Sequence, residues 1–252
     1  MTRLLIHGTG RMGRRIQARL PAFNNFTLVG LVSKSKPEDT NLWSPALADI
    51  DQDVDLLIDF TLPDGTRTVA QWCEQNGVAL VSGTTGLAEE DKLALKKAAR
   101  KVPVLWAPNL SFGVALLDSL VRQAAAALGS EADIHIAETH HVHKVDAPSG
   151  TALALAATAM EGRGKRLEEL LGSKDLGDLV EAEDGGLTFS SVREGEVIGE
   201  HSITFRLAGE EIELRHKALD RDVFAIGALK AAEWLVGQKP GYYSTSDWLG
   251  LN

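Results

Sequence analysis

The chain has 252 residues, 44% of them hydrophobic, which is enough for a sizeable core in one large or two modest domains. Its net charge of −9 at pH 7 argues against general nucleic-acid binding, for which a basic footprint is expected. The single cysteine, Cys73, excludes an intrachain disulfide framework. We expect no apolar run of the roughly 20 residues that span a bilayer and no targeting leader, hence a cytoplasmic protein without a membrane partner.

The first hundred residues alternate short apolar runs with helical patterns. Strands are predicted at 4–7, 27–32, 56–60, 79–81 and 104–106, and helices at 11–20, 63–76 and 88–101. Strands separated by helices are typical of a parallel sheet built from right-handed βαβ units. The runs 56–58 and 79–81 are apolar without alternation, as in strands covered on both faces. We therefore predict an α/β fold with an N-terminal, Rossmann-type, doubly wound parallel sheet.

The pattern changes near Ser111. A long helix is predicted at 113–128, a strand at 134–138, a helix at 151–160, and a helix with a mobile loop in the charged stretch 162–184. Residues 187–193, 201–207 and 211–216 alternate polar and apolar side chains, as antiparallel strands with one solvated face do. A last helix is expected at 223–236. This part predicts a smaller α+β domain with a mixed, largely antiparallel sheet.

A glycine-rich turn follows the first predicted strand and opens the first predicted helix. It has the pattern G-x-G-x-x-G, in which the glycines allow a tight turn and close approach of a pyrophosphate to the helix start. The pattern also occurs in ordinary glycine turns, but its position between a strand and a helix favours dinucleotide binding. The candidate cofactor residues here are Gly8, Thr9, Gly10, Arg11, Met12 and Gly13.

The tip of the second strand lacks the acidic residue with which NAD sites usually hold the ribose hydroxyls. Ser33 and Lys34 stand there instead, and Glu38 and Asp39 come late. A hydroxyl and a lysine suit a 2′-phosphate, so NADPH is expected to be accepted and even preferred, with NADH left open. The alternative is that Lys34 and Lys36 are only solvated loop charges.

Three further predicted strands end in small or polar turns. In an open α/β sheet, ligands bind outside the carboxyl ends of the strands, so these turns are expected to line the ribose and nicotinamide. Any one of them alone is more simply an ordinary turn. The candidates are Phe60, Thr61, Gly83, Thr84, Thr85, Ala107, Pro108 and Asn109.

The segment around His140 carries the chemistry. His140, His141 and His143 precede Lys144, and a Pro-Ser-Gly-Thr turn then opens an alanine-rich helix. A histidine suits the proton that must follow hydride transfer, and a lysine supplies a fixed positive charge. The free amides of a helix start attract a carboxylate. The pattern predicts a carboxylate substrate, and a small dicarboxylate would need such a fixed positive charge. Metal binding is the rival reading, but no further ligand with metal spacing is evident.

Two acidic residues flank this segment. Glu138 is a candidate for orienting a histidine, and Asp146 is a candidate for fixing a loop or a helix entry. Structural roles are the simpler expectation for both.

At these residues the chain resembles the 4-hydroxy-tetrahydrodipicolinate reductase family, long called dihydrodipicolinate reductases. The run from Glu138 to Ala152 carries nearly the whole family motif E-x-H-H-x-x-K-x-D-A-P-S-G-T-A, and the resemblance extends over nearly the full length. It implies NADH- or NADPH-dependent reduction of 4-hydroxy-tetrahydrodipicolinate to tetrahydrodipicolinate in the diaminopimelate pathway of lysine biosynthesis. It also implies a homotetramer, a dinucleotide-binding domain of residues 1–110 and 220–252, and a substrate-binding and tetramerisation domain of residues 111–219.

The resemblance also implies residue roles. His140 would donate the proton, Lys144 would be a second donor or hold a carboxylate, His141 would bind substrate, and Gly150 with Thr151 would bind a carboxylate. The chain departs from many members in its shorter glycine turn, in Ser33-Lys34, and in Leu110, which stands where some relatives place an aromatic near the nicotinamide. An imine or amino-acid dehydrogenase and a non-catalytic dinucleotide sensor are the alternatives, but neither explains the histidine–lysine segment.

Overall fold

The computed structural model describes residues 1–37, 40–167 and 186–251, and the chain divides into two compact units. Unit 1 comprises Met1–Phe112 and Asp222–Asn252, and unit 2 comprises Gly113–Arg221. Glu38, Asp39 and most of the charged stretch predicted as helix and loop lie outside the described residues. Each unit has its own hydrophobic core.

Unit 1 is built on a parallel sheet with the strand order β11-β6-β5-β4-β1-β2-β3. The order reverses between β1 and β4, as in doubly wound dinucleotide-binding sheets. The strands are β1 (Thr2–His7), β2 (Phe26–Val32), β3 (Trp43–Ser44), β4 (Leu56–Asp59), β5 (Ala79–Ser82), β6 (Pro103–Trp106) and β11 (Gly241–Tyr243). The helices are α1 (Arg11–Arg19), α2 (Pro63–Asn76), α3 (Glu89–Ala98), α7 (Asp222–Leu235) and α8 (Thr245–Leu249), with short 3₁₀ turns at Leu20–Ala22 and Leu47–Asp49.

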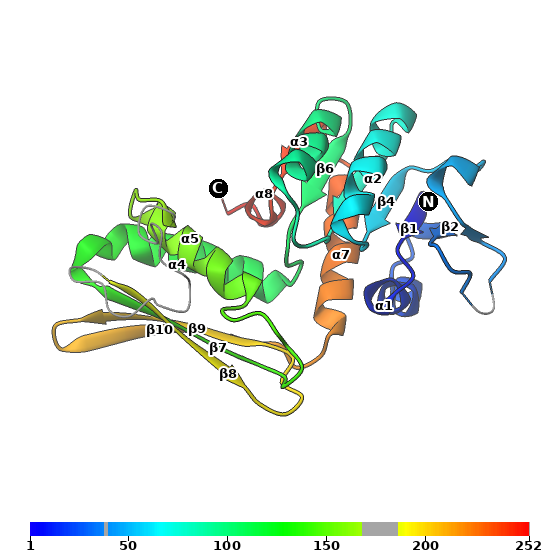
Figure 1. The fold of residues 1–252 in the computed structure, drawn as a ribbon. Coiled ribbons are helices and arrows are strands. Elements are labelled where there is room, and N and C mark those ends of the chain that lie inside the picture. Colours follow the sequence, from blue (N-terminus) through cyan, green and yellow to red (C-terminus); the bar gives the residue numbers. More distant parts are fainter. Residues whose placement is uncertain (38–39, 168–185, 252) are drawn as a thin grey trace. The chain divides into compact units, whose positions relative to one another are not determined.

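Helices α1 and α7 cover one face of this sheet, and α2 and α3 cover the other (Figure 1). Successive residues of a strand point to opposite faces. On β1, Leu4 and Ile6 therefore face the core formed with α1 and α7, whereas Leu5 faces the core formed with α2 and α3. All three side chains are completely buried. The predicted Rossmann-type sheet is therefore confirmed, and its apolar strands lack alternation because both faces are dry.

Unit 2 is a four-stranded sheet with the order β10-β9-β7-β8, covered on one face by two helices (Figure 1). Ile136 and Phe205 of the sheet pack with Val121 of α4 and Leu155 of α5. The elements are α4 (Phe112–Leu128), a 3₁₀ turn at Gly129–Glu131, β7 (Asp133–His140), α5 (Gly150–Gly162), β8 (Leu187–Arg193), β9 (Glu200–Leu207) and β10 (Glu210–Lys217).

The sheet of unit 2 is mixed, as predicted, but one strand runs in an unexpected direction. β9 pairs antiparallel with both β7 and β10, whereas β8 pairs parallel with β7. The expectation that residues 187–193 form an antiparallel strand was wrong. Alternation reports only that one face is solvated, and says nothing about strand direction. The parallel pairing brings Arg193 beside His140 at the carboxyl ends of both strands.

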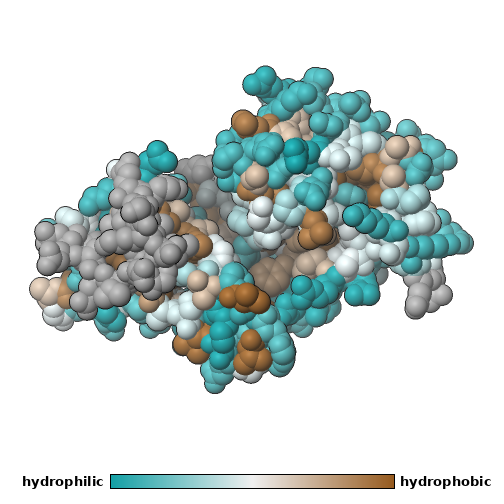
Figure 2. Space-filling model, viewed as in Figure 1, coloured by the Kyte–Doolittle hydropathy of each residue, from teal (hydrophilic) through white to brown (hydrophobic). Residues whose placement is uncertain are grey.

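Helix α4 and the 3₁₀ turn that continues it, Phe112–Glu131, together span 20 residues, and the most apolar 18 of them have a mean hydropathy of 1.2, which is enough by length and composition to cross a membrane. The expectation that no apolar run reaches this length was therefore wrong. Such a helix is weak evidence for a membrane span, because the core helix of a soluble protein passes the same test. Leu117, Val121 and Ala125 are buried in the core of unit 2. The face drawn in Figure 2 is mainly hydrophilic, with its apolar side chains in small separate groups.

Candidate active site

The three glycines of the turn between β1 and α1 differ in what surrounds them. Gly8 has φ +97°, and a Cβ atom there would lie 2.3 Å from the carbonyl oxygen of Phe60. At Gly13 a Cβ would lie 1.9 Å from the carbonyl oxygen of Gly8, so only glycine lets α1 approach the turn. Gly10 has open space on its Cβ side. In a dinucleotide-binding turn, the first glycine allows the tight turn, the second lets the pyrophosphate approach the backbone, and the third allows the helix to pack closely. Gly8, Gly10 and Gly13 have these three environments in this order.

The other cofactor candidates meet at one edge of the sheet, because all strands of unit 1 run parallel. Gly10 caps α1 without a side chain and the first turn of α1 has no acidic residue, so its positive end can receive an anion. Leu110, like Ala107, is buried in the core of unit 1. The edge carries Thr9, Arg11 and Met12 after β1, Ser33 and Lys34 after β2, Phe60 and Thr61 after β4, Gly83, Thr84 and Thr85 after β5, and Ala107, Pro108 and Asn109 after β6.

Asp59, at the end of β4, organises this edge and was missed as a functional candidate. Its completely buried carboxylate accepts hydrogen bonds from Thr61 Oγ1 at 2.8 Å, Ser82 Oγ at 3.0 Å and Thr84 Oγ1 at 2.9 Å, and lies 3.0 Å from His7 Nδ1. One carboxylate thus fixes the ends of β1, β4 and β5. The signal in the sequence was an aspartate that ends an otherwise apolar strand.

In unit 2, His140 is buried at the end of β7, and its Nδ1 is hydrogen-bonded to Glu138 Oε2. The two residues are neighbours on one face of the strand, because side chains two positions apart in a strand point the same way. Burial raises the pKa of Glu138, but hydrogen bonds from Arg193, Ser191 and His140 lower it more, so the carboxyl group is ionised. Burial lowers the pKa of His140, and the contact with Glu138 opposes that effect only in part.

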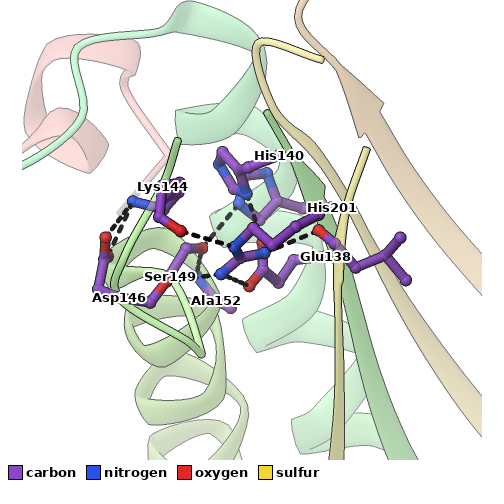
Figure 3. A network of polar contacts seen from close by, with 9 residues as sticks. Glu138, His140, Lys144, Asp146, Ser149, Ala152 and His201 are labelled. Carbon is purple, nitrogen blue, oxygen red and sulfur yellow. Dashed lines mark hydrogen bonds and ion pairs between the residues drawn. The ribbon is translucent and has the colours of Figure 1, made fainter. Parts of the chain in front are cut away.

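A second buried histidine lies against the first. The rings of His140 and His201, on β9, meet edge to face with centroids 5.1 Å apart. His201 Nε2 lies 3.1 Å from Ser149 Oγ, which accepts a hydrogen bond from the Ala152 amide and so caps α5 (Figure 3). Burial and then the charge of His140 lower the pKa of His201 to about 4. His201 is therefore neutral at pH 7.

Lys144 and the start of α5 are occupied by a carboxylate of the chain itself. Lys144 Nζ donates to both carboxylate oxygens of Asp146, each at 2.8 Å (Figure 3). Burial raises the pKa of Asp146, but the hydrogen bonds from Lys144 and from the Gly150 amide lower it below its usual range. Asp146 is thus an anion bound to an ammonium group and a helix-start amide, the donors predicted to hold a substrate carboxylate. Thr151 is half-buried in the first turn of α5.

The remaining histidines of the segment lie outside the sheet. His141 is half-buried and His143 is exposed, with ring centroids 6.2 Å apart. No group of three or more potential metal ligands occurs among the residues that the structure describes. The metal reading therefore gains no support from the described part of the chain.

A doubly wound sheet with this glycine turn, joined to a unit that presents a buried histidine and a lysine, defines an NAD(P)H-dependent oxidoreductase. Residues 2–110 match the family description "Dihydrodipicolinate reductase, N-terminus" and residues 113–249 match "Dihydrodipicolinate reductase, C-terminus". The chain belongs to the dihydrodipicolinate reductase family.

Curated relatives and a solved structure agree with this assignment. The chain is 40% identical to the 4-hydroxy-tetrahydrodipicolinate reductase of Alkalilimnicola ehrlichii, over 99% of both proteins. It is 42% identical to that of Zymomonas mobilis, over 98% of this chain and 96% of the relative. A dihydrodipicolinate reductase from Paenisporosarcina with dipicolinate bound superimposes with a TM-score of 0.81 at 26% identity, covering 98% of each chain.

Proposed function

We propose that this protein reduces 4-hydroxy-tetrahydrodipicolinate to tetrahydrodipicolinate with NADPH or NADH, in the diaminopimelate route to lysine. Family membership over nearly the whole chain supports the reaction. The pair of Glu138 and His140, close to a lysine and a helix start, is the structural observation that supports the chemistry. Residues 1–110 with 220–252 would bind the dinucleotide, and residues 111–219 would bind the substrate and form the tetramer.

In this mechanism the residues of unit 1 hold the cofactor. The amides at the start of α1 bind the pyrophosphate, and Gly10 leaves room for its approach. The turns held by Asp59 line the ribose and nicotinamide. The reduced nicotinamide supplies the hydride. Ser33 and Lys34 would hold the 2′-phosphate of NADPH, because a hydroxyl and an ammonium group favour a phosphate where NAD enzymes place an acidic residue.

The residues of unit 2 hold the substrate and supply the proton. One substrate carboxylate takes the place of Asp146 on Lys144 and the amides of Gly150 and Thr151, and His141 assists binding. The ionised Glu138 keeps the Nδ1 proton on His140, so Nε2 is the atom that exchanges a proton. In the free enzyme the lowered pKa leaves His140 largely neutral at pH 7. A doubly negative substrate beside it raises that pKa and charges the proton donor when it is needed.

The decisive experiment measures the loss of NADPH absorbance with enzymatically generated 4-hydroxy-tetrahydrodipicolinate. We expect turnover with both nucleotides and the higher kcat/KM with NADPH. Lys34→Glu should reverse that preference without changing kcat for NADH. Absence of turnover with either nucleotide would refute the function, whereas an NADH preference in the wild type would refute only the role of Lys34.

Two further properties are proposed from the family. A homotetramer joined through the sheet of unit 2 fits the exposed outer strand β10, on which Ile212 is 42% exposed. Sedimentation should give four times the mass of the chain. A cytoplasmic location fits a biosynthetic enzyme that uses a nicotinamide cofactor, and cell fractionation tests it.

A further inference from the structure

Arg193 is the residue that connects the proposed proton donor with the loop of the proposed carboxylate holder. It ends β8 and is the register partner of His140 across the parallel β7–β8 pair. Its Nη2 donates to Glu138 Oε1 at 2.9 Å and to the carbonyl oxygen of Asp146 at 2.6 Å. Its Nε donates to the carbonyl oxygen of Lys144 at 3.2 Å. One planar guanidinium thus contacts both parts of the site.

The contact with Glu138 concerns a side chain that is completely buried. A buried carboxylate is costly unless it is paired, and its two oxygens are divided between Arg193 and His140. Arg193 therefore fixes the position of the Glu138 carboxylate, and Glu138 in turn holds His140 in one orientation and one tautomer. Without Arg193, the hydrogen bonds from Ser191 and His140 would still hold Glu138 ionised, but the carboxylate and the His140 ring would be positioned less precisely.

The two carbonyl contacts concern the loop that carries Lys144. This loop connects β7 to α5. The ammonium group of Lys144 can be positioned precisely only if the backbone of the loop is held in place. Arg193 binds the backbone at Lys144 and at Asp146, one residue to either side of the fully exposed Val145. A lysine at this position would keep the charge but could not reproduce the fork of N–H donors.

We infer that Arg193 is a positioning residue that aligns His140 with Lys144 for the reduction, an inference that rests on the proposed function. Arg193 acts through Glu138 and through the loop backbone, and it reaches the reaction only by way of these groups.

Charge makes the inference testable, because the two partners act on His140 in opposite directions. The groups that face His140 are Glu138 on its own strand, Arg193 on β8, His201 on β9 and Lys144 in the loop. Glu138 raises the pKa of His140, whereas Lys144 and Arg193 lower it. His201 adds no charge near neutral pH, because its own pKa lies at about 4.

The experiment is the pH profile of kcat/KM for the wild type, Arg193→Gln and Glu138→Gln, measured on the full chain. Activity that depends on a protonated His140 falls at high pH. Arg193→Gln should move that fall to higher pH, and Glu138→Gln should move it to lower pH. Both should lower kcat/KM at pH 7 by about 10- to 100-fold, as expected when a reacting group is misplaced by about 1 Å. NADPH affinity should stay within about twofold, since both residues lie in unit 2.

Unmoved profiles, or profiles that move in the same direction, would overturn the inference. Arg122→Gln is the matched control, because its ion pair with Glu161 is exposed and lies on α4 and α5 away from His140. Arg193→Lys covers the case in which Arg193→Gln fails to fold. Arg193→Lys keeps the positive charge, so the pH at which kcat/KM falls should not change, but kcat/KM should still drop about tenfold because the fork of N–H donors is lost. Full activity of Arg193→Lys would overturn the inference. His140→Gln separates the two proposals, since wild-type kcat there would refute the proposed function itself.

Discussion

Acid should weaken unit 2 in a way that can be assigned to one side chain, His201. Its pKa is about 4 in the folded chain and about 6.5 when exposed. The folded state therefore holds the ring neutral while the unfolded state takes up a proton. The stabilising contribution is complete above pH 6.5 and is lost as the pH falls from 6.5 towards 4. Between pH 7 and pH 5, linkage gives a loss of about 2 kcal/mol from this group alone.

The choice of assay follows from the sequence. All five tryptophans lie in unit 1, so their fluorescence does not report on unit 2. Amide hydrogen exchange in peptides from β7 and β9 measures the free energy of opening of unit 2 directly. The protein concentration is kept constant, because association between copies of the chain shifts the apparent stability. His201→Gln keeps a polar group near Ser149 but cannot titrate.

His135, His140 and His216 also have lowered pKa values, so the wild type should lose stability from several rings at once. The difference between wild type and His201→Gln isolates the one ring. The variant should lose about 2 kcal/mol less than the wild type between pH 7 and pH 5. Equal losses in both proteins would show that His201 is solvated or protonated in the folded state, and the reasoning from burial would be refuted.

Other substitutions test separate parts of the structure. Gly13→Ala should destabilise unit 1 by more than about 2 kcal/mol, because the added Cβ atom meets a carbonyl oxygen. Gly10→Ala should leave the thermal unfolding temperature unchanged but weaken NADPH binding at least about tenfold, as measured by calorimetry. Asp146→Asn should lower KM for the dicarboxylate about two- to fivefold, because an exposed ion pair that competes for Lys144 is worth less than about 1 kcal/mol; a raised KM would mean that Asp146 orients the lysine. His140→Ala should lower kcat about 10²–10⁴-fold with a smaller change in KM, and unchanged kcat would remove it as proton donor. Cys73 is completely buried, and burial raises the pKa of its thiol, so it should resist thiol reagents until the protein is denatured; rapid labelling of the native protein would contradict its placement.

The sequence was informative wherever a local pattern decided the structure. Apolar runs and helical spacing located the strands and helices of the doubly wound sheet to within a few residues, and helix α2 was predicted with its bounds because Pro63 opens it and Gly77, with φ +69°, ends it. The short elements were missed. β11 has three residues and β3 has two, which is too few for any periodicity.

The site was predictable in its residue types but not in its partners. Glu138 and His140 share a face because they are two positions apart in a strand, and this spacing was visible. Arg193 and Asp59 were not predicted, because each has a decisive partner far away along the chain: Ser82 lies 23 residues from Asp59, and Glu138 lies 55 residues from Arg193. The pairing of Lys144 with Asp146 was local, but the sequence could not show that the chain supplies its own anion to the amide of Gly150.

The two-part composition of unit 1 has a consequence for synthesis of the chain. Leu4, Ile6 and Ile58 belong to a core that is completed by α7, whose residues are made only after the whole of unit 2. During synthesis, these apolar side chains stay without the helix that buries them until more than a hundred further residues have been made. Unit 2 has no such dependence and can fold first. The protein therefore most needs a chaperone while its N-terminal sheet is incomplete. In strains depleted of chaperones, the protein should accumulate as aggregates.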